Sequence, residues 1–414
     1  MSEAESGPGR GEEDSPVTEK VDAVPARLIK EERRSSSADT VGTGGDHVEL
    51  FSICYSGKTL RLPTSQPHMY QVIYRILKQV YLPLVPQILV GLPKGWTEVI
   101  LDHNQVAECA KKYNMAAKPY AKNWGGSYNT DTLKEWGHPQ CTFRVARDIV
   151  NFAYECAVPR PSDLNNHYKS FSSETYGETN LEQMASIIDE LRLGPSDVFV
   201  DLGSGIGQLV CFTSAYTKIK KAVGIELSPL PAGHAVDLSN YFKKIMAHFG
   251  KNCGKFELIE GDFLNPKFKK LITEEATVIF INNYAFGPDL MFNITNELLQ
   301  ELKHGTRIVT TKPFGSNKRE ITYRSTSDIT AMSDTVQMRS VEHCVSWTAN
   351  KVDFWLTTMD HTKLIKYYED ELHKKKQQRE GSEAVEQHRE HGNKKRKTER
   401  DSNGHKIKFC GNSA

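Results

Sequence analysis

Apolar residues recur at helical spacing in three stretches of the chain. In the first stretch they occupy positions 69, 72, 73, 76, 77 and 80, and residues 143–154 and 181–193 follow a similar rhythm. A period near 3.6 residues gathers such side chains on one face of a helix. We therefore predict three amphipathic helices, whose apolar faces pack against the rest of the protein.

Short apolar runs replace this rhythm from residue 198 onward. Four of them, which we predict to be buried strands, lie at residues 198–201, 221–226, 256–260 and 278–281. A fifth strand precedes residue 315, and residues 341–347 and 354–359 are typical of an antiparallel pair that closes a sheet. Because strands and helices alternate, residues 161–368 predict an α/β fold with a doubly wound, Rossmann-like sheet.

The first of these runs ends in a glycine-rich turn. Residues 198–208 read VFVDLGSGIGQ, so Asp201 is followed by Gly203, Gly205 and Gly207 at alternate positions. A strand that breaks into such a turn and then a helix is typical of nucleotide binding. The dinucleotide spacing G-x-G-x-x-G would place its last glycine at Gln208. The turn therefore indicates a small cationic ligand beside a carboxylate, which suits the methionine part of S-adenosyl-L-methionine.

Side chains that suit the rest of that cofactor follow the next strands. Glu226 ends the second strand, 23 residues after Gly203, where a carboxylate commonly binds ribose hydroxyls. Asp262 and Phe263 follow the third strand and suit an adenine amine and an adenine ring. Asn282, Tyr284 and Phe286 follow the fourth strand, where an amide and aromatic rings would face the methyl donor and the acceptor. The carboxyl ends of parallel strands share one edge of a sheet, so these residues predict one site.

Each of these residues also has a purely structural explanation. Glu226 would serve as a cap, Asp262 as a turn former, and Phe286 as a core residue. Their shared position after successive strands favours a cofactor site over separate structural roles.

At this point the chain resembles a known family. The strings that carry the likeness are LNN at 164–166, YGET at 176–179, DLGSGIGQ at 201–208, GDF at 261–263, NNYAFGP at 282–288, KPF at 312–314 and VSWT at 345–348. They are similar to strings of the non-SET, seven-strand histone H3 lysine methyltransferases (the disruptor-of-telomeric-silencing type), over about residues 140–365. The resemblance implies a class I methyltransferase core. It also implies methylation of the lysine at position 79 of histone H3, within nucleosomes.

The resemblance extends the predicted cofactor site. It implies that the loop around residues 176–179 covers the methionine end, with Glu178 at the α-amino group and Thr179 along the acceptor channel. Thr179 comes just before a predicted helix, so a role as its N-cap is the alternative. The predicted cofactor-binding residues are then Tyr176, Glu178, Thr179, Asp201, Gly203, Gly205, Gln208, Glu226, Asp262, Phe263 and Asn282.

A lysine that accepts a methyl group must first be neutral. A narrow aromatic channel favours the neutral amine, because burial disfavours the charged form. The predicted catalytic residues are Asn282, Phe286, Trp347, Phe354 and Thr179. The family likeness places a tyrosine where this chain has Phe354, so one hydroxyl is missing from the predicted channel mouth. Plain core packing is the alternative for the three aromatic residues.

Composition excludes several other classes of protein. The eight cysteines of this 414-residue chain contain no C-x-x-C pair, which disfavours a structural zinc site and a disulfide framework. We therefore expect no metal, and reduced thiols in a cytosolic or nuclear protein. The sequence shows no apolar N-terminal stretch of the kind that marks a signal peptide. Residues 81–92 are too short and too rich in proline for a membrane span.

Composition and charge divide the chain into four predicted regions. Residues 1–46 form a disordered acidic N-terminus and residues 47–160 a mixed, mostly helical N-terminal region. Residues 161–368 form the methyltransferase core, and residues 369–414 form a basic disordered tail. The net charge of only +1 therefore conceals an acidic beginning and a basic end.

Two basic features indicate a partner. The predicted tail carries Lys374, Lys375, Lys376, Lys394, Lys395, Arg396 and Lys397. Such runs are typical of nuclear localisation signals or of arms that contact DNA phosphates, and a merely solvated tail is the alternative. The loop at residues 315–324, after the fifth strand, carries Lys318, Arg319 and Arg324, which would dock on an acidic histone surface. Family alignment implies that Arg324 is the anchor.

We therefore expect a monomeric chromatin regulator in the nucleus that methylates a lysine in the globular core of histone H3. Its partner would be the nucleosome, through histone H3, an acidic histone surface and DNA, and no membrane. One alternative is a methyltransferase that acts on RNA or on another protein. The other is a weakly active chromatin-binding module that keeps the fold as a platform.

Overall fold

The computed structural model describes residues 47–54, 58–84, 102–122, 131–164, 178–314, 321–326, 328–346 and 351–403. Residues 46–414 form one compact unit, and the predicted acidic N-terminus at residues 1–46 lies outside the described residues. Among the helices described, none is both long enough and apolar enough to cross a bilayer.

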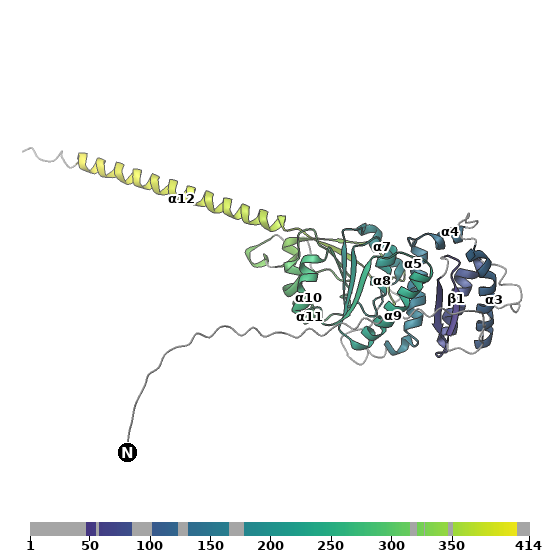
Figure 1. Ribbon diagram of the computed structural model, residues 1–414. Coiled ribbons are helices and arrows are strands. Elements are labelled where there is room, and N and C mark those ends of the chain that lie inside the picture. The colour runs from purple at the N-terminus through teal and green to yellow at the C-terminus, as the bar shows by residue number, and fades with distance from the viewer. Residues whose placement is uncertain are drawn as a thin grey trace, which may run out of the picture. The chain divides into compact units, whose positions relative to one another are not determined.

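A seven-stranded sheet with the order β5-β4-β3-β6-β7-β9-β8 is the centre of the fold (Figure 1). Its strands are β3 (Val198–Leu202), β4 (Lys221–Glu226), β5 (Lys255–Glu260), β6 (Val278–Ile281), β7 (Arg307–Thr310), β8 (Ser333–Gln337) and β9 (Trp355–Met359). The strands β3 to β7 run parallel, and β9 is antiparallel to both of its neighbours. Since the strand order reverses direction beside β3, ligands are expected at the carboxyl end of that strand. The predicted α/β doubly wound sheet is confirmed.

The side chains of the parallel strands alternate between two hydrophobic clusters, one on each face of the sheet. Phe199 and Phe280 belong to the first cluster, while Val200 and Ile279 belong to the second. Helices α7 (Leu181–Leu191), α8 (Gln208–Tyr216) and α9 (Pro229–His248) cover the first face. The second face is covered by α10 (Pro266–Lys270), η3 (Leu271–Glu275), α11 (Pro288–Asn293), η4 (Ile294–Leu298) and η5 (Leu299–Glu301). Figure 1 shows α10 and α11 on the opposite side of the sheet from α8 and α9.

The N-terminal region shares its core with the sheet. Its elements are β1 (His47–Phe51), β2 (Thr59–Pro63), α1 (His68–Ile76), η1 (Leu77–Tyr81), α2 (Leu82–Leu84), α3 (His103–Lys122), α4 (Asp131–Gly137) and α5 (Phe143–Ala157). Helix α5 packs along α9, and one hydrophobic cluster runs from Leu50 to Phe354. The predicted boundary near residue 160 therefore falls inside a single core. The three predicted amphipathic helices are confirmed, since they correspond to α1 with η1, to α5 and to α7.

Buried polar contacts join the N-terminal region to the end of α9. The Tyr81 hydroxyl hydrogen-bonds to Nε2 of His248, and burial lowers the pKa of His248 to about 3. The ammonium of Lys251 donates to the backbone carbonyls of Trp136 and His138, at 2.6 Å each. These contacts satisfy polar groups that would be costly to bury alone. Seven cysteines in the described residues are free thiols, as predicted.

The closing strand pair differs from the prediction. The partner of β9 is Ser333–Gln337, which follows the short helices η6 (Tyr323–Ser325) and η7 (Ile329–Met332), and not residues 341–347. Residues 341–346 form no strand, and Val345 makes a single bridge to Thr179. Cys344 and Val345 are buried although they belong to no strand. Their burial gave residues 341–347 the strand-like pattern on which the prediction depended. The true strand is an edge strand with polar residues, so its sequence carries little hydrophobic signal.

The expectation of a disordered tail from residue 369 is also corrected for the part described. Helix α12 (Thr362–Asn403) is continuous (Figure 1). Almost all of its side chains from residue 369 to residue 396 are exposed. Lysine, glutamate, glutamine and arginine favour helices intrinsically, and Glu371 pairs with Lys374 at 3.0 Å. Such a helix forms without an apolar face against the core, so its sequence has low hydropathy. That low hydropathy led to the prediction of disorder.

Candidate functional site

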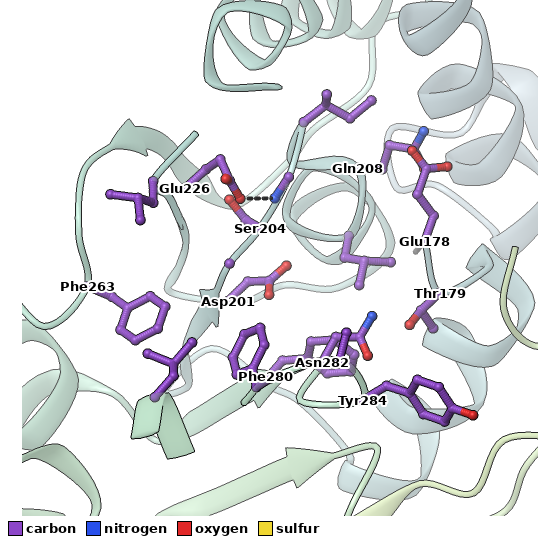
Figure 2. A pocket seen from close by; sticks show the side chains of 18 of the residues that line it. Glu178, Thr179, Asp201, Ser204, Gln208, Glu226, Phe263, Phe280, Asn282 and Tyr284 are labelled. Atoms are coloured by element: carbon purple, nitrogen blue, oxygen red, sulfur yellow. Dashed lines mark hydrogen bonds between the residues drawn. The ribbon is translucent and has the colours of Figure 1, made fainter. Parts of the chain in front are cut away.

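A cavity of about 360 Å³ lies at the carboxyl ends of the parallel strands β3, β4 and β6 (Figure 2). Residues after each of these strands line it, together with the segment that precedes α7. In Figure 2, Asp201 lies in the middle, Glu226 and Phe263 lie to one side, and Thr179 lies to the other. The structure thus brings together side chains from positions 178 to 290, as the sequence predicted for one edge of the sheet.

The glycine turn after β3 takes a backbone conformation that favours glycine. Gly203, Gly205 and Gly207 all have positive φ angles, of 84°, 56° and 85°. A Cβ atom on Gly207 would lie only 2.4 Å from a methyl group of Leu258, so a larger residue would have to displace that side chain as well as adopt a left-handed backbone. Gly207 then serves as the N-cap of α8, which points the start of that helix toward the cavity. The predicted strand, turn and helix are therefore confirmed.

Glu226 connects β4 to this turn. One of its carboxylate oxygens accepts from the N–H of Gly205 at 2.8 Å, and the other accepts from the N–H of Ser228 at 2.8 Å. Its side chain is buried and lines the cavity. Each carboxylate oxygen has a second lone pair, so both can accept another hydrogen bond from a ligand.

Asp201 presents a buried carboxyl group to the same cavity. Burial and the nearby negative charge of Glu226 raise its pKa to about 8. A cationic ligand would supply the charge and the donors that favour the ionised form. The position therefore fits the predicted role beside the cationic end of a ligand.

Asp262 and Phe263 follow β5 and line the cavity. Phe263 lies on the opposite side of it from Thr179 (Figure 2). An oxygen of Asp262 accepts from the N–H of Leu264 at 2.9 Å, so Asp262 forms a turn as well as part of the wall. Phe263 is nearly buried, with 7% of its surface exposed, and Leu264 lies beside it. An acid and a ring together offer an acceptor and a stacking face for a heteroaromatic group.

Asn282 and Asn283 follow β6 and take different roles. Asn282 lines the cavity. Asn283 is buried, and its oxygen accepts from the backbone N–H groups of Thr311 and Lys312 at 3.0 and 2.8 Å. Sequence analysis placed the active amide at Asn282, and the structure puts that residue, and not its neighbour, at the cavity.

Glu178 and Thr179 both line the cavity on the side of α7. The N-cap of α7 is Asn180, whose side chain accepts from the N–H of Gln183 at 2.7 Å, so the alternative role of Thr179 as a cap is wrong. Thr179 is buried with 3% exposed, and its hydroxyl has no hydrogen-bond partner among the described residues. Gln208, at the start of α8, lines the same region. A buried hydroxyl without a partner is costly, which favours a ligand contact at this point.

The predicted aromatic wall is only partly formed by the residues that sequence analysis named. Phe286 lines the cavity. Phe354 does not line it, which corrects that prediction. It is fully buried, and its ring lies 6.5 Å from the ring of Phe280, which does line the cavity. Trp347 and Tyr176 lie outside the described residues.

Wall residues such as Phe280 and Leu227 were not predicted. Phe280 lies inside β6, and Leu227 follows Glu226 with 59% of its surface exposed. A large apolar residue directly after a strand-end acid is the signal in the sequence that could have identified Leu227. Phe280 carried no such signal, because alternation along a doubly buried strand does not distinguish core from cavity.

The predicted basic contacts lie apart from the cavity wall. Arg324 is exposed on the short helix η6, and Lys318 and Arg319 of the same loop lie outside the described residues. Lys374, Lys375, Lys376, Lys394, Lys395 and Arg396 are exposed on α12, and the side chain of Lys397 is outside the described part. A helix therefore presents these charges, where a flexible tail was expected.

Comparison with known proteins identifies relatives of this chain. Residues 154–359 match the family model "Histone methylation protein DOT1". A protein of Caenorhabditis elegans named "Histone-lysine N-methyltransferase, H3 lysine-79 specific" is 60% identical over 412 residues, which cover 99% of this chain. A protein of the same name from Drosophila melanogaster is 34% identical over 245 residues, which cover 59% of this chain. A solved RNA methyltransferase from Salinibacter ruber overlaps 44% of this chain with a TM-score of 0.28, which is too low to support any argument.

The chain spans less than half the length of these relatives, 43% of the nematode protein and 13% of the fly protein. The matched segment nevertheless contains all the elements that form the cavity, from the residues before α7 to α11. The family match and the 60% identity agree with each other and with the strings of residues quoted above. The chain therefore belongs to the DOT1 family of histone methylation proteins.

Proposed function

We propose that this protein uses S-adenosyl-L-methionine to methylate the side-chain amine of the lysine at position 79 of histone H3 in nucleosomes. The observation that carries the proposal is the series Asp201, Glu226, Asp262 and Asn282, which lines one cavity at the sheet edge. The relatives named for this activity support the choice of substrate.

The residues present fit this cofactor. Asp201 would hold its cationic end, because a buried carboxyl with a raised pKa gains most from a nearby positive charge. Glu226 would accept from ribose hydroxyls, and Asp262 and Phe263 would hold the adenine. Glu178 and Thr179 would contact the methionine end, where Thr179 has an unpartnered hydroxyl. When bound, the cofactor supplies a methyl group on a positively charged sulfur that leaves readily.

The acceptor lysine has to lose its proton and approach in line with the methyl group. Phe286, Tyr284 and Phe280 line the cavity and would exclude water from this approach. Exclusion of water disfavours the charged ammonium and so favours the neutral, nucleophilic amine. Alignment of two reacting groups in this way can supply a large share of the rate enhancement. Asn282 would orient the amine, because it lies on the side of the cavity near Thr179 and Tyr284 (Figure 2).

Nucleosome contacts would come from outside the cavity. The basic residues of α12 would approach DNA phosphates, and Arg324 would approach an acidic histone surface. We also propose that the protein works as a monomer, and in the nucleus, where such a substrate is found. The missing hydroxyl at Phe354 gives little support to an inactive module, because that side chain packs behind the cavity wall.

Incubation of the protein with radiolabelled cofactor tests the proposal directly. Nucleosomes, free histones and RNA would be offered separately, and the labelled histone position would be identified by mass spectrometry. We expect label on histone H3 in nucleosomes, and much less of it with Asn282→Ala. Label on RNA or on another protein would support the alternative enzymes. Cofactor binding without any transfer would support a chromatin-binding module.

A further inference from the structure

One buried side chain joins the segments that follow strands β6 and β7. Asn283, after β6, accepts from the N–H groups of Thr311 and Lys312 at 3.0 and 2.8 Å and donates to the carbonyl of Lys312 at 3.0 Å. Asn283 is buried, with 3% of its surface exposed, and these hydrogen bonds join its side-chain amide to the end of the neighbouring strand. The residues on either side of Asn283 are therefore held at a fixed distance from Thr311 and Lys312.

Thr311 contacts the amide that lines the cavity. Its hydroxyl lies 3.1 Å from the Oδ1 atom of Asn282 and also 3.1 Å from the Oδ1 atom of Asn283. Thr311 is buried and does not itself line the cavity. The hydroxyl is thus placed behind Asn282, where it can restrict the rotation of that side chain.

Lys312 contacts the aromatic residue on the same side. Its ammonium donates to the backbone carbonyl of Tyr284 and lies 4.9 Å from the centroid of the Tyr284 ring. A cation at this distance from the face of a tyrosine is attracted to the ring. Tyr284 lines the cavity, while Lys312 does not. Figure 2 shows Tyr284 and Asn282 on neighbouring parts of the wall.

We propose that Thr311 and Lys312 are positioning residues for the acceptor side of the cavity. Thr311 fixes the side chain of Asn282, and Lys312 fixes the backbone and the ring of Tyr284. Neither residue would touch the cofactor or the acceptor lysine. The proposal rests on the proposed function, because it assigns to these residues the alignment of the acceptor. It also gives a role to the first residue of the KPF string at 312–314, which the cavity alone leaves unexplained.

Matched substitutions separate positioning from folding. Thr311→Val removes the hydroxyl at nearly constant shape, and Thr311→Ser keeps it. Lys312→Met removes the charge, and Lys312→Arg keeps it. We expect kcat on nucleosomes to fall about ten- to a hundredfold in the Val and Met variants, since small misalignments have effects of this size. The Ser and Arg variants should retain most of the activity, and all four should bind the cofactor within about twofold of the unaltered protein by calorimetry.

A double-mutant cycle tests the contact between Lys312 and Tyr284. If Lys312 acts through Tyr284, Lys312→Met should reduce kcat much less in a Tyr284→Ala background than in the unaltered protein. Additive effects would overturn this part of the proposal. Equal kcat values for Thr311→Val and Thr311→Ser would overturn the other part.

A measurement that does not depend on turnover distinguishes a failure of the positioning proposal from a failure of the proposed function. The side-chain amide resonances of Asn282, assigned by its substitution, should shift in cofactor-free Thr311→Val and stay in place in Thr311→Ser. If the unaltered protein methylates no histone, the proposed function fails, while these resonances still report whether Thr311 holds Asn282. If the protein is active and the resonances do not move, positioning by Thr311 is rejected.

Discussion

The carboxylate of Glu226 accepts a hydrogen bond from the backbone N–H of Gly205 at 2.8 Å. The acid that ends β4 thereby braces the glycine turn that follows β3. Glu226 has two roles for this reason, as part of the cavity wall and as a support of the turn beneath it. A substitution there should disturb the ligand contact and the shape of the cradle together.

Glu226→Ala should weaken cofactor binding. It removes an acceptor from ligand donors and leaves the N–H of Gly205 without its partner, at a cost of about 1–3 kcal/mol for each unpaired group. Calorimetry on the purified variant measures the change. Glu257→Ala is the control, because that acid lies on β5 and pairs with Lys221 away from the cavity. Equal affinities for the two variants would remove Glu226 from the site.

Asn282→Ala should reduce turnover more than it reduces stability. Asn282 lies at the cavity, and Asn283 hydrogen-bonds to the end of β7. Removing the Asn282 side chain therefore leaves the contacts of Asn283 between β6 and β7 in place. We expect a large fall in kcat with little change in the midpoint of thermal unfolding. A variant that methylates nucleosomes at the normal rate would show that the acceptor site lies elsewhere.

Asp201 should make the stability of the cofactor-free protein depend on pH. Its pKa of about 8 lies above the ordinary value, so the folded state holds this proton more tightly than the unfolded state does. The free energy of unfolding should therefore fall as the pH rises from about 4 to 8, and this contribution should change no further above that range.

Asp201→Asn removes this titrating group and provides the comparison. Urea denaturation at pH 5 and at pH 8 should show that the variant gains stability relative to the unaltered protein as the pH rises. A difference between the two proteins that is the same at both pH values would contradict the prediction.

The basic residues of α12 should give nucleosome binding a steep dependence on salt. Each phosphate contact on duplex DNA contributes about 0.9 to the slope of log affinity against log salt. Removing residues 371–414 should weaken binding and flatten this slope, as measured by fluorescence anisotropy in a salt series. Replacing Lys374, Lys375 and Lys376 with glutamine should produce part of the effect. An unchanged slope after truncation would leave nuclear import as the role of these residues.

Arg324→Ala should lower activity on nucleosomes and leave cofactor binding intact. The residue is exposed on η6, outside the cavity wall, so its loss should affect only docking. The unaltered protein should also be far more active on nucleosomes than on free histone H3, because a free histone lacks both the assembled acidic surface and the DNA. Comparable rates on the two substrates would contradict the docking model and point to an enzyme that acts on exposed chains.

The parts of the fold that could be predicted are those with a local pattern. The glycine turn at residues 203–207, the amphipathic helix α5 and the acid at the end of β4 each occupy a short stretch with its own periodicity or spacing. Asp201, Glu226, Asp262 and Asn282 could be brought together because one rule places the carboxyl ends of parallel strands at one edge.

The features that were missed depend on distant partners. Residues 341–346 have a strand-like alternation, but Val345 is buried by a bridge to Thr179, which no local pattern reveals. Phe354 was expected at the channel mouth, and it lies behind Phe280 because β9 pairs with β7 inside the sheet. The contact between Thr311 and Asn282 joins two strand ends that lie 29 positions apart.

The continuous core has a consequence for how the protein can be divided. The family is recognised over residues 154–359, a segment that begins inside α5, although α5 is buried along α9 and starts at Phe143. The family model and the folded core thus have different boundaries in this chain. A fragment cut to the recognised segment would expose the apolar faces of α9 and of the shortened α5 to water. We therefore expect the portion that carries the cavity to fold stably only together with the helices at its N-terminal side.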